Sequence, residues 1–326
     1  MQAMELLKKA PEVSFVVPVY NGEKFLGTCL DHILRQRVDK EIIIIIDGAT
    51  DGTADVAAAY QAQHKCITVI DSPNQGSGYA RNQGIRLARG RFIYFVDADD
   101  WLEVKDLDRY VKLADLYGAD MVRGRILVDD EGTEILDPSY IAFPEVEGDN
   151  ASIMPAFEFY NRAIEAWTPA AWANLYRRSF VVKNELFFTE TNSVDDILFL
   201  VDAYSKDVEA KMLVVSEIFM RYRVHGENTS FNAQHLVNQM EIADEIMRRI
   251  RLLEGQEASD VRDKLLFAMR GTICNMFHYY FVSYLSCSDR VKEALHPYIN
   301  VPMVEFYNAY AKDYIKRPIK VDFAQV

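Results

Sequence analysis

The stretch EIIIIIDGATDGT, residues 41–53, decides how the first half of the chain folds. Its five consecutive isoleucines place β-branched side chains on both faces of an extended segment, which is typical of a strand buried on both sides. Such strands occur in parallel sheets that helices cover on both faces. The stretch ends on Asp47 and a run of Gly, Asp and Thr, residues that form turns and begin helices. It therefore predicts a central strand, a polar turn and a helix.

Strands and helices alternate on either side of this stretch. The further predicted strands are VSFVVPV (13–19), ITVID (67–71), RFIYFVD (91–97) and ADMVRGRILVDD (119–130). The segments between them have helical patterns, and we expect Asn21 to cap the first of these helices. The alternation predicts an α/β fold, with a mostly parallel, Rossmann-like sheet flanked by helices.

The second half of the chain changes character. KMLVVSEIFMRYRVH, residues 211–225, predicts one more strand, and the sequence is helical from about residue 231 onward. We therefore expect a first domain over 1–230 and a helical C-terminal subdomain over 231–326. The aromatic stretch MFHYYFVSYL, residues 276–285, indicates a packing face of that subdomain. Contact with a membrane surface and homo-oligomer formation through these helices remain alternatives.

Composition excludes several classes of protein. The chain has 326 residues, 50% of them hydrophobic, which is enough for a large core. A net charge of −13 argues against a nucleic-acid partner, because nucleic-acid surfaces require basic clusters. The four cysteines form no C-x-x-C pair, which disfavours a thiolate zinc site. The first residues lack a signal-peptide pattern, and no run approaches roughly 18 apolar residues. We expect a cytoplasmic protein, with peripheral contact at the inner face of the cell membrane as the alternative.

The stretch RFIYFVDADDW, residues 91–101, ends a buried strand on three carboxylates: Asp97, Asp99 and Asp100. Two carboxylates about 4 Å apart repel each other by about 4 kcal/mol at an effective dielectric constant of about 20. A divalent cation relieves that repulsion, and Mg²⁺ or Mn²⁺ prefers one or two carboxylates together with substrate phosphates. The alternative is that Asp99 and Asp100 only cap the following helix.

Two other predicted strand ends carry polar groups suited to a nucleotide. Asp47 can accept a hydrogen bond from the imide N–H of uracil, although it is also an ordinary turn residue. The glycine-rich segment NQGSGYARN, residues 74–82, leads into a helix that carries Arg81. A dinucleotide fingerprint does not fit this segment, because Arg81 stands where the last Gly or Ala belongs. Ligands of open α/β sheets bind at the carboxyl ends of the strands, where these groups are expected to meet.

These motifs, in this order and spacing, make residues 13–130 resemble the family 2 glycosyltransferases, inverting enzymes with the GT-A fold. The matching text is VSFVVPVYNGEKFLGTCLDHILRQ, EIIIIIDGATDGT and NQGSGYARNQGIRLARGRFIYFVDADDW. The resemblance continues more weakly to about residue 230, through WANLYRRSFVVKNELFF, NSVDDILFL and YRVHGENTS. One departure stands out, since the family typically has two adjacent acids at the end of the second strand and Ile46 replaces the first of them.

The resemblance implies a nucleotide-binding set of residues. Pro18 and Tyr20 frame the nucleobase, with Tyr20 stacking on it, and Asp47 reads uracil. Arg81 helps to hold the base or the diphosphate, and Asp97 reaches the ribose.

The resemblance also implies a metal site and a base. Asp99 ligates Mn²⁺ or Mg²⁺, and His225 completes the metal or phosphate site, although a lone histidine is more often structural. Asp100 is expected to begin the next helix. In SVDD, residues 193–196, Asp195 and Asp196 match the family's Glu-Asp motif. Asp196 is the expected general base, with Asp195 as its orienter or substitute, and a helix-capping role remains open for either carboxylate.

The resulting hypothesis is a metal-dependent inverting glycosyltransferase. It moves a hexose from a nucleotide sugar, a UDP-sugar by the role of Asp47, to a hydroxyl of a glycan or lipid-linked acceptor in cell-surface polysaccharide synthesis. Two alternatives belong to other classes: an NAD-type dehydrogenase on a doubly wound sheet, and a non-catalytic glycosyltransferase-like binding module.

Overall fold

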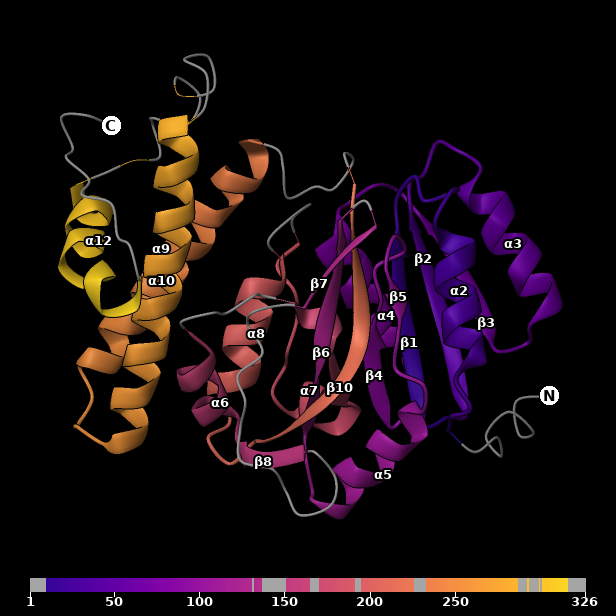
Figure 1. Cartoon of the computed structure of the whole chain (residues 1–326), viewed down its shortest axis with the longest axis horizontal. Coiled ribbons are helices and arrows are strands. Elements are labelled where there is room, and N and C mark those ends of the chain that lie inside the picture. The colour runs from indigo at the N-terminus through magenta and orange to yellow at the C-terminus, as the bar shows by residue number, and fades with distance from the viewer. Residues whose placement is uncertain are drawn as a thin grey trace. The chain divides into compact units, whose positions relative to one another are not determined.

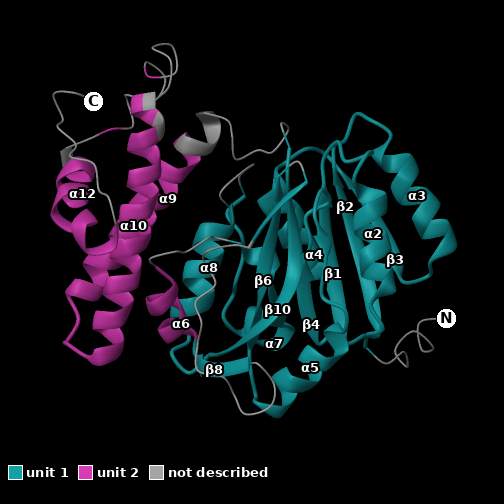
Figure 2. Cartoon of the chain, viewed as in Figure 1, with its two compact units in different colours: residues 1–137, 142–155, 170–226 teal, residues 138–141, 156–169, 227–326 magenta. Residues whose placement is uncertain are grey.

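The computed structural model describes residues 10–130, 132–136, 151–164, 170–190, 195–225, 233–286, 292, 299 and 301–315. The chain forms two compact units. The first comprises residues 1–137, 142–155 and 170–226, and the second comprises 138–141, 156–169 and 227–326 (Figure 2). All candidate site residues predicted from the sequence belong to the first unit.

A mixed β-sheet forms the centre of the first unit (Figure 1). One half is parallel, in the order β3 (Ile67–Ser72), β2 (Lys40–Asp47), β1 (Val13–Val19) and β4 (Phe92–Phe95). The other half continues with β9 (Asn174–Arg177), β6 (Met121–Asp130), β10 (Lys211–Val224) and β5 (Trp101–Leu102). Strand β9 runs antiparallel to both of its neighbours, whereas β6 and β10 are parallel to each other. Strands β7 (Thr133–Leu136) and β8 (Ala151–Pro155) pair with β6 and β10.

Helices flank the sheet, which confirms the predicted α/β fold class. They are α2 (Leu26–Arg35), α3 (Thr53–Gln63), α4 (Ser77–Leu87), α5 (Leu107–Leu116), α7 (Arg178–Lys183) and α8 (Asp195–Ser205), with a short 3₁₀ turn, η2, at Ala171–Ala173. Strand β1 is buried at every position, and so is β2 from Glu41 to Asp47. The isoleucine run therefore lies in the core, as its pattern predicts. Burial of each such side chain contributes about 1.5–3 kcal/mol.

Asn21 does not cap the first helix. Helix α2 begins at Leu26, and Asn21 has a positive φ of 48°. Its Oδ1 atom accepts hydrogen bonds from the backbone N–H of Thr50, at 2.7 Å, and from the Thr50 hydroxyl. The predicted cap is therefore wrong: the side chain joins the turn after β1 to the turn after β2, because a short amide tolerates the left-handed backbone that this turn needs.

Helices make up the described part of the second unit: α6 (Ala156–Ala163), α9 (Ala233–Glu254), α10 (Asp260–Ser286) and α12 (Val301–Tyr314). Along α10 the predicted aromatic face is buried at Phe277, Tyr280, Phe281 and Tyr284, whereas Tyr279, Val282 and Leu285 are exposed. Among the described helices, none has the length and apolar character needed to cross a membrane. Peripheral membrane contact, homo-oligomer formation and the cytoplasmic location stay predictions.

The central strand gives a first test. Ile44 is fully buried on β2, whereas Ile135 on β7 is 50% exposed. We expect Ile44→Ala to lower the free energy of unfolding by about 2–5 kcal/mol, because it removes buried apolar contacts and leaves a cavity. The matched change Ile135→Ala is expected to stay within about 0.5 kcal/mol of wild type in urea denaturation. Equal losses in the two variants would contradict the described sheet.

Candidate active site

The carboxyl ends of β1, β2 and β4 meet at one edge of the parallel half-sheet, because neighbouring parallel strands end at the same edge. Tyr20 follows β1 and is 54% exposed, whereas Pro18 is buried within the strand. Asp47 ends β2, and Asp97 follows β4. The structure therefore brings the predicted nucleotide-binding residues of three strands to the same edge. Their contacts with a nucleotide stay predictions.

Asp47 holds the glycine-rich loop. Its Oδ1 atom accepts the backbone N–H of Gln75 at 2.7 Å, and its Oδ2 atom accepts that of Gly76 at 2.8 Å. Gly76 has a φ of 98°, which only glycine adopts without strain. Each carboxylate oxygen has two lone pairs, so Asp47 keeps acceptor capacity for a base. The predicted uracil reader is thus also the anchor of the loop before α4.

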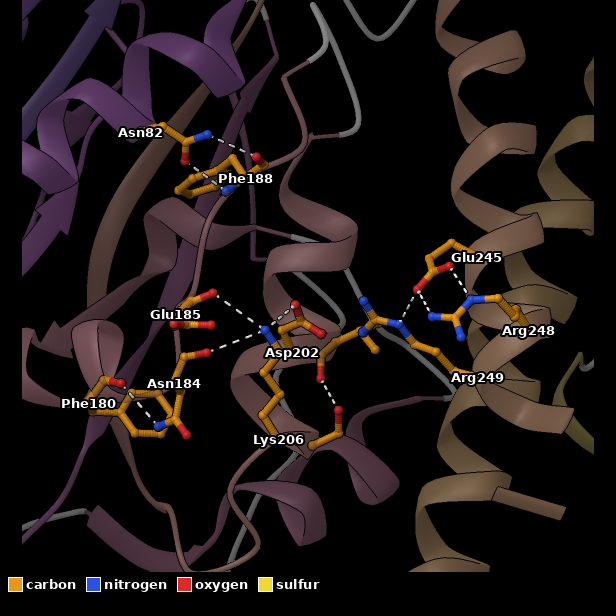
Figure 3. A network of polar contacts seen from close by, with 12 residues as sticks. Asn82, Phe180, Asn184, Glu185, Phe188, Asp202, Lys206, Glu245, Arg248 and Arg249 are labelled. Carbon is orange, nitrogen blue, oxygen red and sulfur yellow. Dashed lines mark hydrogen bonds and ion pairs between the residues drawn. The ribbon is translucent and has the colours of Figure 1, made fainter. Parts of the chain in front are cut away.

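Helix α4 is fastened to the segment that leads into α8. A Cβ atom on Gly78 would lie 1.8 Å from the carbonyl oxygen of Thr189, so only glycine fits there. One turn later, the Asn82 amide donates to the Phe188 carbonyl at 3.0 Å and accepts the Phe188 backbone N–H at 2.9 Å (Figure 3). These contacts hold Phe188 and Thr189 against α4.

The far end of α8 is fastened as well. The ammonium of Lys206 donates to the carbonyls of Asn184, at 3.3 Å, and Glu185, at 3.4 Å, and it pairs with Asp202 at 3.1 Å (Figure 3). These contacts tie the end of α8 to the segment after α7.

Arg81 connects the nucleotide edge to α8. Its guanidinium is buried and forms ion pairs with Asp97, at 2.5 Å, and with Asp195. Burial disfavours the cation, but Asp195 and Asp97 outweigh that cost and raise the pKa of Arg81 above its usual value. The sequence predicts that Arg81 holds the base or diphosphate. The structure places its Nη atoms between two carboxylates, and the contact with a nucleotide stays a prediction.

Asp195 and Asp196 differ in their surroundings. Asp195 is 4% exposed and bound to Arg81, whereas Asp196 is only partly buried. Burial raises the pKa of Asp196 to about 7, the neighbouring negative charge of Asp195 adds to the rise, and Arg81 opposes it. A carboxylate that titrates near neutral pH is suited to general-base catalysis. The pair therefore divides into a buried carboxylate paired with Arg81, Asp195, and a more accessible one, Asp196, and their roles as orienter and base stay predictions.

Asp99 and His225 come together from distant parts of the sequence. Asp99 Oδ2 and His225 Nε2 are 3.1 Å apart, and Phe25 packs against the imidazole with ring centroids 4.9 Å apart. Burial and the charge of Asp97 raise the pKa of Asp99, while His225 opposes the rise. Burial and the neighbouring charge of Asp97 thus both disfavour the ionised form of Asp99, and a bound cation would favour it.

The donor set fits a divalent cation shared with a diphosphate. Among the described residues, no group of three or more His, Cys, Asp or Glu side chains is arranged to hold a metal ion by itself. One or two protein ligands, completed by phosphate oxygens and water, are the usual arrangement for Mg²⁺. A carboxylate beside an imidazole also suits Mn²⁺. The metal-ligand roles of Asp99 and His225 stay predictions.

Asp100 does not begin the following helix, contrary to the prediction. It is 1% exposed, and its Oδ1 atom accepts the backbone N–H of Arg223 at 2.9 Å. Trp101 and Leu102 next form β5, which pairs with β10, and α5 begins only at Leu107. Both side chains are large and mostly apolar, which favours a strand in the sheet over the start of a helix. Asp100 therefore ties the acidic turn to the end of β10.

Several residues around the site had no signal in the sequence. Arg223 stacks between the rings of Trp101, at 4.6 Å, and Phe25, at 4.9 Å. The backbone N–H of Ala171 donates to Asp196 at 3.3 Å, and Arg123 on β6 donates to the neighbouring Ala170 carbonyl. Single arginines in strands and main-chain amides form no motif, so only the folded chain reveals them.

With this geometry in place, comparison with known proteins identifies the family. The model of glycosyl transferase family 2 matches residues 14–183, more than half of the chain. The chain belongs to this family. The resemblance seen in the sequence is thereby confirmed, and the motifs after β1, β2 and β4 lie inside the matched region.

Relatives agree with this assignment. The chain is 32% identical over 222 residues to a putative glycosyltransferase, EpsH, of Bacillus subtilis, covering 67% of this chain and 62% of the relative. It is 24% identical to a poly(ribitol-phosphate) beta-glucosyltransferase of Bacillus spizizenii, covering 79% of this chain and 40% of the relative. The chain thus spans less than two thirds of either relative.

A solved structure confirms the predicted GT-A type of fold. The crystal structure of TarS residues 1–349 from S. aureus, in complex with UDP-GlcNAc, superimposes with a TM-score of 0.65 at 19% identity. The match covers 93% of this chain and 88% of that one. At this level of identity, the likeness speaks for the fold alone.

The contact between α4 and Thr189 can be tested directly. We expect Gly78→Ala to lower the free energy of unfolding by about 1–3 kcal/mol, because the new methyl group overlaps a backbone oxygen that cannot rotate away. Gly255→Ala is the matched control, since its Cβ would meet nothing closer than 3.6 Å. Thermal denaturation of the two variants measures the difference, and a neutral Gly78→Ala would show that the segment before α8 is not held against α4.

Proposed function

We propose that the protein is a metal-dependent inverting glycosyltransferase that transfers a hexose from a UDP-sugar to a hydroxyl of a glycan or lipid-linked acceptor. The observation that carries the proposal is the bridge through Arg81, which links Asp97 at the nucleotide edge to Asp195, next to the base candidate Asp196. Family membership supports the reaction class. UDP-GlcNAc is bound in the similar TarS structure, and poly(ribitol-phosphate) stands in the name of a similar beta-glucosyltransferase. These two molecules support a UDP-sugar donor and a cell-surface polysaccharide acceptor.

Donor binding uses the edge formed by β1, β2 and β4. The exposed ring of Tyr20 offers a stacking surface for the base, which buries apolar area and fixes the plane of the ring. Asp47 reads the imide N–H with its remaining lone pairs while its oxygens hold the loop at Gln75 and Gly76. Asp97, held in place by Arg81, accepts a hydrogen bond from a hydroxyl of the ribose. These contacts place the diphosphate toward Asp99.

Asp99 and His225 are the residues that would hold the divalent cation. Bound there, Mn²⁺ or Mg²⁺ would neutralise the charge that develops on the leaving diphosphate. Asp100 keeps the acidic turn in place through the Arg223 amide, so that Asp99 stays within reach of His225. Cys29, which is buried beneath the turn, directs its thiol to the Asp97 carbonyl.

Asp196 performs the proton transfer. An acceptor hydroxyl is a weak nucleophile at neutral pH, and the carboxylate takes its proton while the oxygen attacks the anomeric carbon opposite the leaving diphosphate. One C–O bond forms as the other breaks, so the configuration at that carbon inverts. Asp195 is occupied by its ion pair with Arg81, whereas Asp196 is partly exposed and has a pKa raised to about 7, so Asp196 is the member of the pair suited to act as the base.

The dehydrogenase alternative loses its support. Strand β1 ends on PVYNG rather than on a glycine fingerprint, and the matched family is one of glycosyl transferases. A non-catalytic module with the same fold remains as an outcome of the experiments below.

Donor and metal binding form the first test. We expect calorimetry to detect UDP binding in the presence of Mn²⁺, with an affinity about 10- to 100-fold weaker in EDTA or in Asp99→Ala. Asp106→Ala is the matched control, because Asp106 is exposed and makes no side-chain cap to α5. A screen of UDP-, GDP- and dTDP-sugars for hydrolysis identifies the donor. If no nucleotide binds, the proposed function is wrong.

Asp196 is tested by substitution and by pH. Asp196→Asn is expected to lower kcat by roughly 10²–10⁴-fold, because the amide cannot take the proton, while UDP affinity stays within about twofold. In wild type, kcat/KM should fall as pH drops below about 7, because the raised pKa leaves Asp196 protonated there. Full turnover by Asp196→Asn would show that Asp196 is not the base. If the wild type binds UDP but turns over no donor, the result would favour the non-catalytic module.

A further inference from the structure

The peptide group that joins Ala170 to Ala171 lies directly against the base candidate. Both residues are buried, and Ala171 opens the η2 turn. The N–H of this peptide group, from Ala171, donates to Asp196 Oδ2 at 3.3 Å. Its carbonyl, from Ala170, points the other way, so whatever binds that oxygen acts on the same peptide group.

A buried cation binds that oxygen. Arg123, on β6 and 8% exposed, donates through Nη1 to the Ala170 carbonyl at 3.0 Å. The amide of Asn174 also donates to it, at 3.2 Å, and so does the backbone N–H of Ala173, at 3.2 Å. Arg123 and Asn174 are register partners on adjacent strands, so the sheet itself sets this arrangement.

The next peptide group is fixed from another strand. Tyr176, on β9 and fully buried, donates its hydroxyl to the Ala171 carbonyl at 3.0 Å. The same hydroxyl accepts a hydrogen bond from Asn174 at 3.1 Å. Arg123, Asn174 and Tyr176 thus hold the chain from Ala170 to Ala171 by its carbonyls, which leaves the Ala171 N–H aimed at Asp196.

The three groups in line form a polarised chain: guanidinium, peptide group, carboxylate. A cation on the carbonyl draws electron density through the amide and makes its N–H a stronger donor. A stronger donor on Asp196 favours the ionised carboxylate. A buried guanidinium is costly unless its charge is compensated, and the carboxylate at the far end of the peptide group carries the opposite charge.

The electrostatics of two buried phenols agree with this placement. Burial raises the pKa of Tyr176 and of Tyr204; Arg123 opposes the rise and Asp196 adds to it in both residues. The positive charge of Arg123 and the negative charge of Asp196 therefore act on the same two hydroxyl groups. The ionisable groups that face Asp196 from the surrounding elements are Asp195 and Tyr204 on α8, Arg81 on α4, Asp97 after β4, and Tyr176 on β9.

We propose that Arg123 is a positioning residue for Asp196, acting through the peptide group between Ala170 and Ala171. The proposal rests on the proposed function, in which Asp196 is the base. Arg81 is engaged by Asp97 and Asp195, so it acts on the acidic pair directly. Arg123 instead acts on the ionisation and orientation of Asp196 through this peptide group.

The test measures the titration of Asp196 itself. The full-length protein is labelled with aspartate carrying ¹³C at its carboxyl carbon, and Asp196→Asn identifies the resonance. We expect Arg123→Gln, which keeps a donor but removes the charge, to move the titration midpoint of Asp196 upward by about 0.5–1 pH unit. Arg123→Lys should restore part of the difference. The acid limb of kcat/KM should move equally, with KM for the donor within about twofold.

Controls separate this effect from lost stability. Arg89→Gln removes the same formal charge from an exposed side chain and should leave the midpoint in place. Tyr176→Phe removes the hydrogen bond to the Ala171 carbonyl and should raise the titration midpoint of Asp196 by a smaller amount. This variant provides a second measurement if Arg123→Gln does not fold. An unchanged midpoint in the folded variants, even with a lower melting temperature, overturns the proposal. The carboxyl titration needs no turnover, so an inactive wild type would refute the proposed function and still decide the role of Arg123.

Discussion

The ion pairs of Arg81 with Asp97 and Asp195 are the interaction on which the candidate site depends. They join the turn after β4 to the first residue of α8, two places separated by almost a hundred residues of sequence. Charges buried in this way are stable only together, because removal of one partner leaves the others desolvated and unpaired. The helix that carries Arg81 must therefore keep a fixed position relative to both acids. The contacts of Gly78 with Thr189 and of Asn82 with Phe188 help to hold that helix in place.

This arrangement divides chemically similar groups into different roles. Asp195 and Asp196 are neighbours on one helix, yet Asp195 is buried in an ion pair with Arg81, whereas Asp196 is partly exposed and its pKa is raised to about 7. The same holds in the acidic turn, where Asp97 binds Arg81, Asp99 meets His225 and Asp100 accepts a backbone amide. In both places the fold assigns each carboxylate a different partner, and the partner decides what the carboxylate can do.

The sequence predicted the parallel half of the sheet well, because buried strands such as residues 42–46 have an unambiguous apolar pattern. It also predicted which strand ends carry polar groups. The sequence-based prediction was wrong where contacts between distant residues determine the position of a side chain. Asn21 binds Thr50 instead of capping α2, and Asp100 binds Arg223 instead of beginning a helix. No local sequence pattern indicates the ion pair of Arg81 with Asp195. The same is true of the peptide group between Arg123 and Asp196, because both contacts form only when the strands and helices come together.

The attachment of the glycine-rich loop to Asp47 has a consequence for how such a protein can diversify. The two oxygens that we propose to read the nucleobase also hold the amides of Gln75 and Gly76. A mutation that altered base preference at this position would at the same time release the loop in front of α4, the helix that carries Arg81. Changes of donor would therefore have to arise elsewhere around the pocket, or through paired substitutions that keep the loop attached. In addition to its proposed role in binding, Asp47 would thus restrict how donor preference can change during evolution.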